Sequence, residues 1–467
     1  MGTHATKDRV GPPALASASK WRRVIGLAGP ALAQQLFLLV IQLYDQFLAG
    51  FFTEEHTAAL NTANYLYWAV TSYTSIVSVG ATAVVARFVG AMDYPMANRA
   101  VGQSIILAAA CGLAAALAGL LGVAVIVRFL GLHGASAEYA VQYLLPLAGL
   151  LPFYLIEVGG IACLIGAGDT RTGLRTLGGV VCLNVPLAWF LSQGSLGFVG
   201  IAWGTSISHA LGCLFVLAVL FRGRFNLLLT FANLIPDFAL LYRLLRVSVP
   251  AAIDSLSTTF GQLWFLTIIN TLGPIAASAH GIAIRCEGLG YLSGAAFGIA
   301  AMSLVGQNLG AKQPGHAARD AWTAFAAGGV IMSLMGVIFY WFAPEMLSAF
   351  SPASNREAIV AVGVPALQLV AFAMPAVACT IILSASLRGA GDTRVPMLFT
   401  WSGFFGVRIP LAYWLTGAVV DLGPLGTFEG ANLGLMGAWW AMFADLYFRA
   451  ILLVIRFASG RWKYARV

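Results

Sequence analysis

The chain repeats a long segment of its own sequence, and this duplication limits its architecture more than any other feature. The hexapeptide GAGDTR occurs at residues 166–171 and again at residues 389–394. In both copies, PLA and aromatic residues follow, at Pro186 and at Pro410. A repeat of this length predicts one structural half that is built twice.

Two further pairs of segments extend the repeat. LGFVGIAW at residues 196–203 matches LGLMGAWW at residues 433–440, and RFVGA at residues 87–91 matches QNLGA at residues 307–311. The duplication therefore reaches well beyond the hexapeptide on both sides.

The amino-acid composition indicates whether this protein is surrounded by water or by lipid. Hydrophobic residues make up 60% of the 467 residues and charged residues only 9%. A water-soluble domain of this length would lack the polar residues needed to cover its surface. We therefore expect an integral membrane protein. The net charge of +8 does not indicate nucleic-acid binding, because the basic residues separate apolar runs and form no basic stripe.

Twelve apolar runs are long enough to cross a hydrocarbon layer of about 30 Å. They lie at 24–50, 58–86, 100–127, 139–165, 173–192, 196–221, 245–270, 275–305, 321–343, 357–387, 395–416 and 432–455. The sequence thus predicts an all-α membrane protein of twelve helices in two pseudo-symmetric six-helix lobes. The expected layout is an N-terminal tail (1–23), an N-lobe (24–222), a linker (223–244), a C-lobe (245–457) and a C-terminal tail (458–467).

The placement of basic residues supports this count independently. With both termini on the inner side, the outer loops hold only Arg128 and Arg356 of the 26 Lys and Arg. Three more arginines fall inside spans, and all the others lie in inner segments. This bias predicts cytoplasmic termini and a multi-pass membrane protein. Because each half has an even number of spans, the two copies share one orientation.

Duplicated lobes are suited to alternating access, so the chemistry should lie where polar groups occur inside the spans. Asp45 follows Pro30 in the first span, and the acidic outer loop with Glu54 comes soon after it. Pro30 removes a backbone donor and can bend the helix. A submerged carboxyl group can take up a proton or, with oxygen neighbours, hold a hard cation. The alternative for Asp45 is a wetted residue near a helix end.

Comparison of the two copies predicts that the site belongs to one lobe. Asp45, Asn184 and Thr205 are oxygen-bearing residues of the first half. Alignment on the shared prolines and tryptophans places opposite them Trp264 or Phe265, Arg408, and Met442. If the three oxygen-bearing side chains converge, a cation or proton site exists only in the N-lobe, and Arg408 puts a positive charge at the matching place in the other lobe.

The remaining intramembrane charges allow two interpretations each. Glu157 either serves a cavity, in proton relay or cation binding, or makes a local structural bond. Asp254 is either an inner gate or a charge at the start of its helix. Asp445 and Arg449 are four residues apart on one helix face, and with Arg408 they are expected to form a neutralised structural cluster in the C-lobe.

The sequence resembles the multidrug and toxic compound extrusion (MATE) transporters over residues 22–457. The resemblance rests on YDQFLAG in the first span, VARFVGAMDYPMANRA after the second, both GAGDTR turns and AHGIAIRCEGLGYLSGAAFGIAAMSLVGQNLGA across the eighth. It implies the MATE-like fold and an amino-lobe proton or sodium site formed by Asp45, Asn184 and Thr205. It also implies that Tyr143 is a cavity tyrosine, since its spacing before Pro152 is similar to that in the family.

Two departures from the family pattern bear on the coupling ion. Ala188 stands where the family often has a second Asp or Asn, which removes a ligand for sodium. The tenth span, residues 357–387, carries no internal acid, unlike members of the NorM type. In these respects the chain is similar to the DinF type, for which the resemblance implies proton coupling.

We therefore expect an antiporter that exports amphipathic, often cationic compounds in exchange for protons, acts as a monomer and needs no cofactor. Sodium coupling through the same three residues is one alternative. A flippase for a lipid-linked precursor is another, although such proteins usually have fourteen spans and an arginine-rich cavity. A membrane enzyme is disfavoured, since the sequence has no metal cluster, no nucleophile with a base and no phosphate-binding loop.

Overall fold

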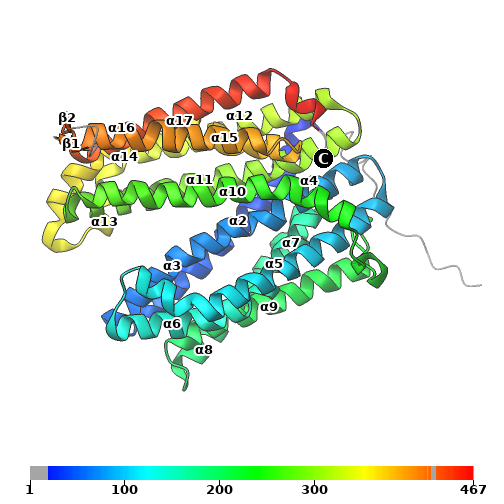
Figure 1. Cartoon of the computed structure of the whole chain (residues 1–467), viewed down its shortest axis with the longest axis horizontal. Helices are drawn as coiled ribbons and strands as arrows, with labels where there is room; N and C mark the ends of the chain where they lie inside the picture. Colours follow the sequence, from blue (N-terminus) through cyan, green and yellow to red (C-terminus); the bar gives the residue numbers. More distant parts are fainter. Residues whose placement is uncertain (1–18, 418, 422–426, 466–467) are drawn as a thin grey trace, which may run out of the picture. The chain divides into compact units, whose positions relative to one another are not determined.

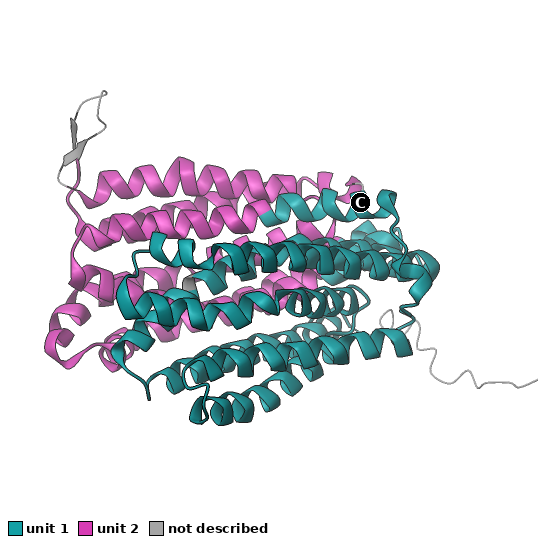
Figure 2. Cartoon of the chain, turned by 60° about the horizontal axis from the view of Figure 1, so that its bottom comes forward, with its two compact units in different colours: residues 1–252, 303–317, 467 teal, residues 253–302, 318–466 magenta. Residues whose placement is uncertain are grey.

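The fold is almost entirely helical and divides into two compact units. The computed structural model describes residues 19–417, 419–421 and 427–465, so most of the expected tail 1–23 lies outside the described residues. Unit 1 takes residues up to 252 together with residues 303–317, and unit 2 takes residues 253–302 and 318–466 (Figure 2). Figure 1 labels the helices and strands that are named below.

Unit 1 is a helix bundle in which α8 and α9 form the most extensive pairing. Its helices are α2 (Lys20–Ala49), α3 (Glu54–Tyr73), α4 (Ser75–Gly90), α5 (Tyr94–Phe129), α6 (Gly134–Gly149), α7 (Leu151–Gly166), α8 (Thr170–Gln193), α9 (Val199–Arg222) and the short η1 (Phe231–Leu234).

Unit 2 contains the remaining helices and a small hairpin. Its elements are α12 (Pro314–Trp341), α13 (Ala343–Phe350), η2 (Ala353–Asn355), α14 (Arg356–Gly389), α15 (Arg394–Gly403), the π-helical turn η3 (Phe404–Arg408), α16 (Ile409–Thr416), β1 (Val419–Asp421), β2 (Thr427–Glu429), α17 (Gly434–Ala458) and η5 (Arg461–Tyr464). Helices α10 (Phe238–Asn270) and α11 (Pro274–Gly310) contribute residues to both units, and the first four residues of α12 also belong to unit 1.

Each of the twelve expected spans is helical, which confirms the predicted fold class. Among the described residues, nine helices have the length and apolar composition to cross a membrane, and a tenth span results if α6 and α7 are counted together. α10 and α17 are also long enough, with 33 and 25 residues at about 1.5 Å rise per residue. The second, fourth and eleventh spans are interrupted, at Thr74, at Leu150 and at η3. The break at Leu150 bends the fourth span by 51°.

The structure departs from a purely helical chain between α16 and α17. Val419 pairs with Glu429, and Asp421 pairs with Thr427, in an antiparallel two-stranded hairpin. The expected linker is also more ordered than a loop, because α10 begins at Phe238 and Gln103 of α5 donates to the backbone carbonyls of Asn233 and Ile235.

The duplicated hexapeptide forms the same turn in both copies. Gly168 and Gly391 take φ values of +89° and +87°, a region in which glycine has no steric cost. The amide of Asp169 donates to the carbonyl of Leu164, and that of Asp392 donates to Leu387, at 2.8 and 2.9 Å. Matching backbone geometry at matching positions supports the structural repeat that the sequence predicts.

A second duplicated segment produces a close backbone approach within unit 1. A Cβ added at Gly90 of α4 would overlap the carbonyl of Gln307, and one added at Gly310 would overlap the carbonyl of Arg87. Only a residue without a side chain fits at either position. The ends of α4 and α11 therefore cross with their backbones in contact.

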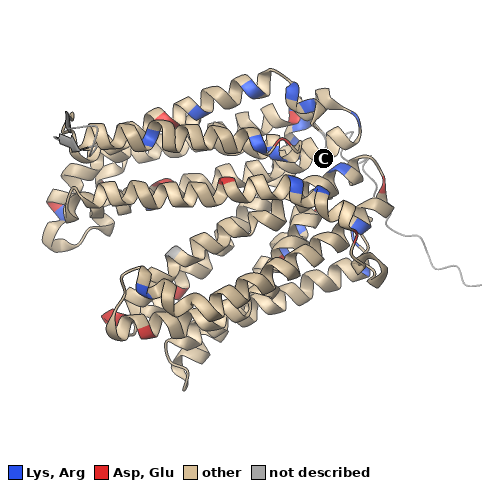
Figure 3. Cartoon of the chain, viewed as in Figure 1, with Lys and Arg blue, Asp and Glu red and all other residues tan. Residues whose placement is uncertain are grey.

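Charge is distributed unequally along the unit 1 bundle. Basic side chains gather at the end of the bundle where α4 ends and α5 begins, and acidic side chains gather at the end where α3 begins (Figure 3). Arg99, Arg171 and Arg222 lie in terminal turns at the basic end, whereas Glu54 and Glu138 lie at the other. The two ends therefore differ in sign, as the sequence predicts for a membrane protein.

Candidate functional site

Asp45, Asn184 and Thr205 come together in unit 1, although they lie on three different helices. The hydroxyl of Thr205 on α9 donates to Asp45 on α2, with Oγ1 at 3.1 Å from Oδ2 and 3.4 Å from Oδ1. The amide Nδ2 of Asn184 on α8 donates to Thr205 Oγ1 at 2.9 Å. All three residues are buried. They form a continuous chain of hydrogen bonds that ends on the carboxyl group.

Tyr143 of α6 completes the immediate surroundings of Asp45. Its hydroxyl donates to Asp45 Oδ2 at 3.4 Å, and its ring packs against Phe198 at 5.1 Å between centroids. The apolar cluster around this ring also includes Leu48 and Ala188. Asp45 thus lies between hydroxyl donors on one side and hydrocarbon on the other.

Close packing of α8 against α9 fixes the distance between Asn184 and Thr205. Gly204 precedes Thr205, and a Cβ there would lie 2.6 Å from the Cα of Ala188. Since Gly204 has no side chain, the two backbones approach and their polar residues can bond directly. Pro30 lies inside the continuous helix α2, on the N-terminal side of Asp45.

The charge of Asp45 is not balanced by a neighbouring cation. Its side-chain partners among the described residues are the hydroxyl groups of Thr205 and Tyr143, and no Lys or Arg of the described chain forms an ion pair with it. Only 7% of the residue is exposed. A buried carboxylate without a counter-ion is unstable, so this site favours either a proton or a bound cation.

Asn184 offers a further oxygen at this site. Its Oδ1 is buried and has no hydrogen-bond partner in the described part of the chain. Carboxylate, hydroxyl and amide oxygens are ligands that hard cations prefer. The donor set therefore fits a sodium ion as well as a proton, and geometry alone does not decide between them.

The polar cluster borders a large cavity that is contained in unit 1. This cavity has a volume of about 520 Å³, in the range of small-molecule sites. Asp45, Tyr143 and Thr205 line it, together with Tyr67 and His209. The rest of the wall is mainly Ala, Leu, Val and Ile from α2, α3, α5, α6 and α7. A site of this kind suits an amphipathic molecule of moderate size.

Glu157 has a partner that the sequence analysis did not identify. Its Oε2 lies 2.8 Å from Nδ1 of His209 on α9. Glu157 itself does not line the cavity, but His209 does. The signal was present in the sequence, since His209 comes four residues after Thr205 and so shares its helix face.

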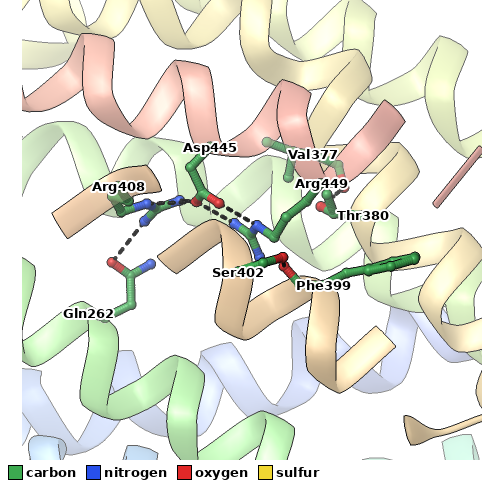
Figure 4. A network of polar contacts seen from close by, with 8 residues as sticks. All are labelled: Gln262, Val377, Thr380, Phe399, Ser402, Arg408, Asp445 and Arg449. Atoms are coloured by element: carbon green, nitrogen blue, oxygen red, sulfur yellow. Dashed lines mark hydrogen bonds and ion pairs between the residues drawn. The ribbon is translucent and has the colours of Figure 1, made fainter. Parts of the chain in front are cut away.

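The other predicted site residues lie in unit 2, where each takes part in an ion pair. Asp254 of α10 forms an ion pair with Arg388 of α14. Arg408 and Arg449 both bind Asp445, each at 2.7 Å (Figure 4). The structure thus separates the ten predicted residues into a group in unit 1 and a group of ion pairs in unit 2.

The unit 2 cluster occupies the place that matches the unit 1 site in the repeat. Arg408, the counterpart of Asn184, lies with its guanidinium carbon 5.5 Å from the ring centre of Phe265 and 4.2 Å from that of Phe404. Gln262 accepts a hydrogen bond from Arg408 Nη1 at 3.4 Å (Figure 4). Where unit 1 has an uncompensated acid, unit 2 has arginines already paired with an acid.

Known proteins match this chain over nearly its whole length. It is 26% identical over 448 residues to a probable multidrug resistance protein NorM of Thermotoga maritima, covering 95% of this chain and 93% of that protein. It is 29% identical over 328 residues to the multidrug resistance protein NorM of Burkholderia vietnamiensis, covering 65% and 66% of the two chains.

Solved structures share the fold at low sequence identity. A multidrug resistance MATE family transporter in an outward-facing conformation aligns with a TM-score of 0.86 at 20% identity, over 97% of this chain and 98% of that one. A MOP superfamily transporter from Pyrococcus furiosus aligns with a TM-score of 0.87 at 20% identity, over the same shares.

The family model matches the chain twice, once in each repeat. The MatE model covers residues 30–190 and again residues 250–414. These two segments include the duplicated hexapeptides and, in the first, Asp45 and Asn184. The duplicated match and the full-length relatives together show that the chain belongs to the MatE family, the MATE transporters of multidrug efflux.

Proposed function

We propose that this protein is an antiporter that exports amphipathic, often cationic compounds in exchange for protons. The observation that carries the proposal is the uncompensated carboxyl group of Asp45 in the wall of the cavity. A proton entering this group neutralises it, and its departure restores a charge that hydroxyl groups alone must solvate. The protein works as a transporter of small molecules and not as an enzyme.

Protonation of Asp45 changes the hydrogen bonds that join its helix to the neighbouring helices. A charged Asp45 accepts from both Thr205 and Tyr143, whereas a neutral carboxyl group can also donate. The change therefore alters bonds between α2, α6 and α9. We propose that α2 repacks at Pro30 in response, and solved relatives are described in both a bent and a straight conformation.

Small energies are sufficient for such a switch. Two conformations that differ by a few kcal/mol change their populations strongly when one proton binds them unequally. The membrane potential contributes about 2.3 kcal/mol per charge per 100 mV. One carboxyl group in a hydrophobic wall can therefore couple the proton gradient to release of the exported compound.

Sodium is the second candidate for the coupling ion, and one observation favours it. The unpaired Oδ1 of Asn184 lies on the residue that already bonds Thr205, so three kinds of oxygen ligand are available near Asp45. Ala188 supplies no ligand where a carboxylate or amide would strengthen a sodium site. For this reason we favour the proton.

We further propose that both termini are cytoplasmic in a bacterial plasma membrane and that the chain acts as a monomer. The basic end of the unit 1 bundle supports this orientation, since Lys and Arg concentrate on the cytoplasmic side of membrane proteins. The N-lobe, residues 24–222, and the C-lobe, residues 245–457, are proposed as the two copies of the repeat.

Efflux from liposomes tests the proposal. Purified protein is reconstituted, a fluorescent cationic dye is enclosed, and a pH gradient or a sodium gradient at fixed pH is imposed on wild type, Asp45→Asn and Glu138→Gln. Glu138 is a matched control because it is an exposed acid on α6 of the same unit. We expect efflux driven by the pH gradient that Asp45→Asn abolishes and Glu138→Gln retains. Efflux driven only by the sodium gradient would show that sodium, not the proton, is the coupling ion. No efflux with either gradient would refute antiport of such compounds.

A further inference from the structure

Glu157 and His209 form a pair of ionisable side chains at the wall of the unit 1 cavity, apart from Asp45. Glu157 Oε2 and His209 Nδ1 are 2.8 Å apart, and the two side chains are 1% and 10% exposed. Only His209 lines the cavity. The carboxyl group is therefore sealed behind the imidazole, and a ligand in the cavity meets the ring and not the acid.

The packing around Glu157 explains why it stays behind the ring. A Cβ at Gly212 of α9 would lie 2.7 Å from Glu157 Oε1 and 2.7 Å from a methyl group of Val180. Gly212 thus leaves the space that the carboxyl group occupies. Oε1 is buried and has no hydrogen-bond partner in the described chain, so the only polar contact of this carboxyl group is the imidazole.

This arrangement fixes the chemistry of the imidazole. An ionised carboxylate only accepts hydrogen bonds, so Nδ1 must carry the hydrogen that it shares with Glu157. In the neutral ring the other nitrogen, Nε2, then holds a lone pair. Within the described residues Nε2 has no hydrogen-bond partner, and it is not among the nitrogens sealed from the cavity.

We propose that Nε2 of His209 accepts a hydrogen bond from an N–H group of the exported organic cation, and that a proton competes with the compound for this nitrogen. When the proton binds Nε2, the ring becomes an imidazolium held by Glu157, its lone pair is lost and its charge repels the cation. The inference rests on the proposed export of cationic compounds. It adds a point of direct exchange that is distinct from Asp45.

Aromatic side chains beside His209 suit the same ligand. The ring of Tyr154 lies 5.0 Å from the imidazole in an edge-to-face arrangement, and Tyr67 lines the same cavity. Aromatic faces attract organic cations, and their edges leave the nitrogen accessible. An N–H group that bonds Nε2 would therefore place the rest of the cation against a tyrosine wall.

Other ionisable groups face the same space and must be separated in a test of pH dependence. The cavity is lined by Asp45 on α2, Tyr67 and Tyr73 on α3, Tyr143 on α6 and Tyr154 on α7. Glu157 on α7 and Cys213 on α9 do not line it, but they lie near His209 and near each other. The ionisable residues of α8 are Arg171 and Arg175 in its first turns and the exposed Cys182. Asp45 affects every cation in the cavity, whereas His209 should distinguish cations by their hydrogen-bond donors.

Two lipophilic cations with and without N–H groups test this inference. Binding of ethidium, which carries amino groups, and of tetraphenylphosphonium, which carries none, is measured by equilibrium dialysis with the purified full-length protein between pH 5.5 and 8. The readout is the ratio of the two affinities, because the effect of Asp45 on a cation is common to both. We expect the ratio in wild type to favour ethidium by about tenfold more at pH 8 than at pH 5.5, as one lost hydrogen bond predicts.

The variants are His209→Ala, Glu157→Gln and the exposed control Glu138→Gln. His209→Ala should remove the pH dependence of the ratio, and Glu157→Gln, which keeps the volume of the side chain, should reduce it. Glu138→Gln should retain it. A ratio that keeps its pH dependence in His209→Ala, or that is independent of pH in wild type, would overturn the inference. The binding assay needs no ion gradient, so its failure leaves the efflux test of the proposed function unaffected.

Discussion

Removal of the carboxylate of Asp445 tests whether the unit 2 cluster is structural. Asp445 is 0% exposed and accepts three hydrogen bonds of 2.7 to 2.8 Å from Arg408 and Arg449, and Nη2 of Arg408 makes a further ion-pair contact with it at 2.7 Å. The substitution Asp445→Asn leaves two buried guanidinium groups without their shared negative charge and turns one acceptor oxygen into a donor. Breaking a buried ion pair in this way costs about 3–5 kcal/mol. For a unit of this size, that corresponds to a fall of about 6–20 °C in the midpoint of thermal unfolding.

The measurement is thermal unfolding of the purified protein in detergent, followed by tryptophan fluorescence. Asp392→Asn is the matched control, because it breaks the pair of Asp392 and Arg456, whose side chains are 10% and 23% exposed. This pair is more exposed than the Asp445 cluster and leaves one arginine unpaired instead of two, so its loss should cost less. The triple variant Arg408→Met, Asp445→Leu and Arg449→Leu should recover most of the lost thermal stability. Apolar residues of similar volume can replace a buried charge cluster at no cost in the free energy of unfolding. A loss in Asp445→Asn no larger than in Asp392→Asn would refute the structural role.

Three further predictions concern unit 1. Gly212→Ala should displace Glu157 from behind His209, because the new Cβ would meet Oε1 at 2.7 Å, and dialysis should then show the same reduced pH dependence of the affinity ratio as in Glu157→Gln. Pro30→Ala restores a backbone hydrogen bond inside α2; efflux rates in liposomes should fall several-fold while dye binding is retained, and unchanged rates would contradict a hinge there. A membrane-impermeant maleimide should label Glu138→Cys in intact cells and Arg99→Cys only after permeabilisation, and the reverse pattern would exclude cytoplasmic termini.

Hydrophobic runs and the repeat were sufficient to predict the helices, because each of these signals is local or internal to the sequence. The duplicated hexapeptide fixed the same turn twice, with Gly168 and Gly391 at nearly equal φ. Comparison of the two copies also predicted that Asp45 belongs to the polar cluster of unit 1. The second copy has an aromatic residue, Trp264 or Phe265, where the first copy has the carboxyl group of Asp45, and this difference indicated that the site belongs to the first copy.

Contacts between helices were harder to predict because they depend on helix rotation and depth. Glu157 and His209 are on different spans, and nothing in the apolar pattern tells which face of α7 meets α9. The breaks at Thr74 and Leu150 escaped prediction for a different reason, since hydropathy measures burial in lipid and not the direction of the helix axis. The hairpin after α16 depends on cross-strand pairing, which so short a segment does not indicate.

The crossing of α4 and α11 has a consequence for how this sequence can evolve. Gly90 and Gly310 occupy the same position in the two copies of the repeat, and each faces the backbone beside the other. If the gene arose by duplication, both glycines descend from a single glycine of the ancestral half. Elsewhere the copies have diverged, with Asn184 in one and Arg408 in the other, but here a side chain gained by either glycine collides with the backbone of the opposite helix, at Gln307 or at Arg87. Divergence of the two halves is therefore expected to stop at this pair, which should persist as glycine in both or be lost from both together.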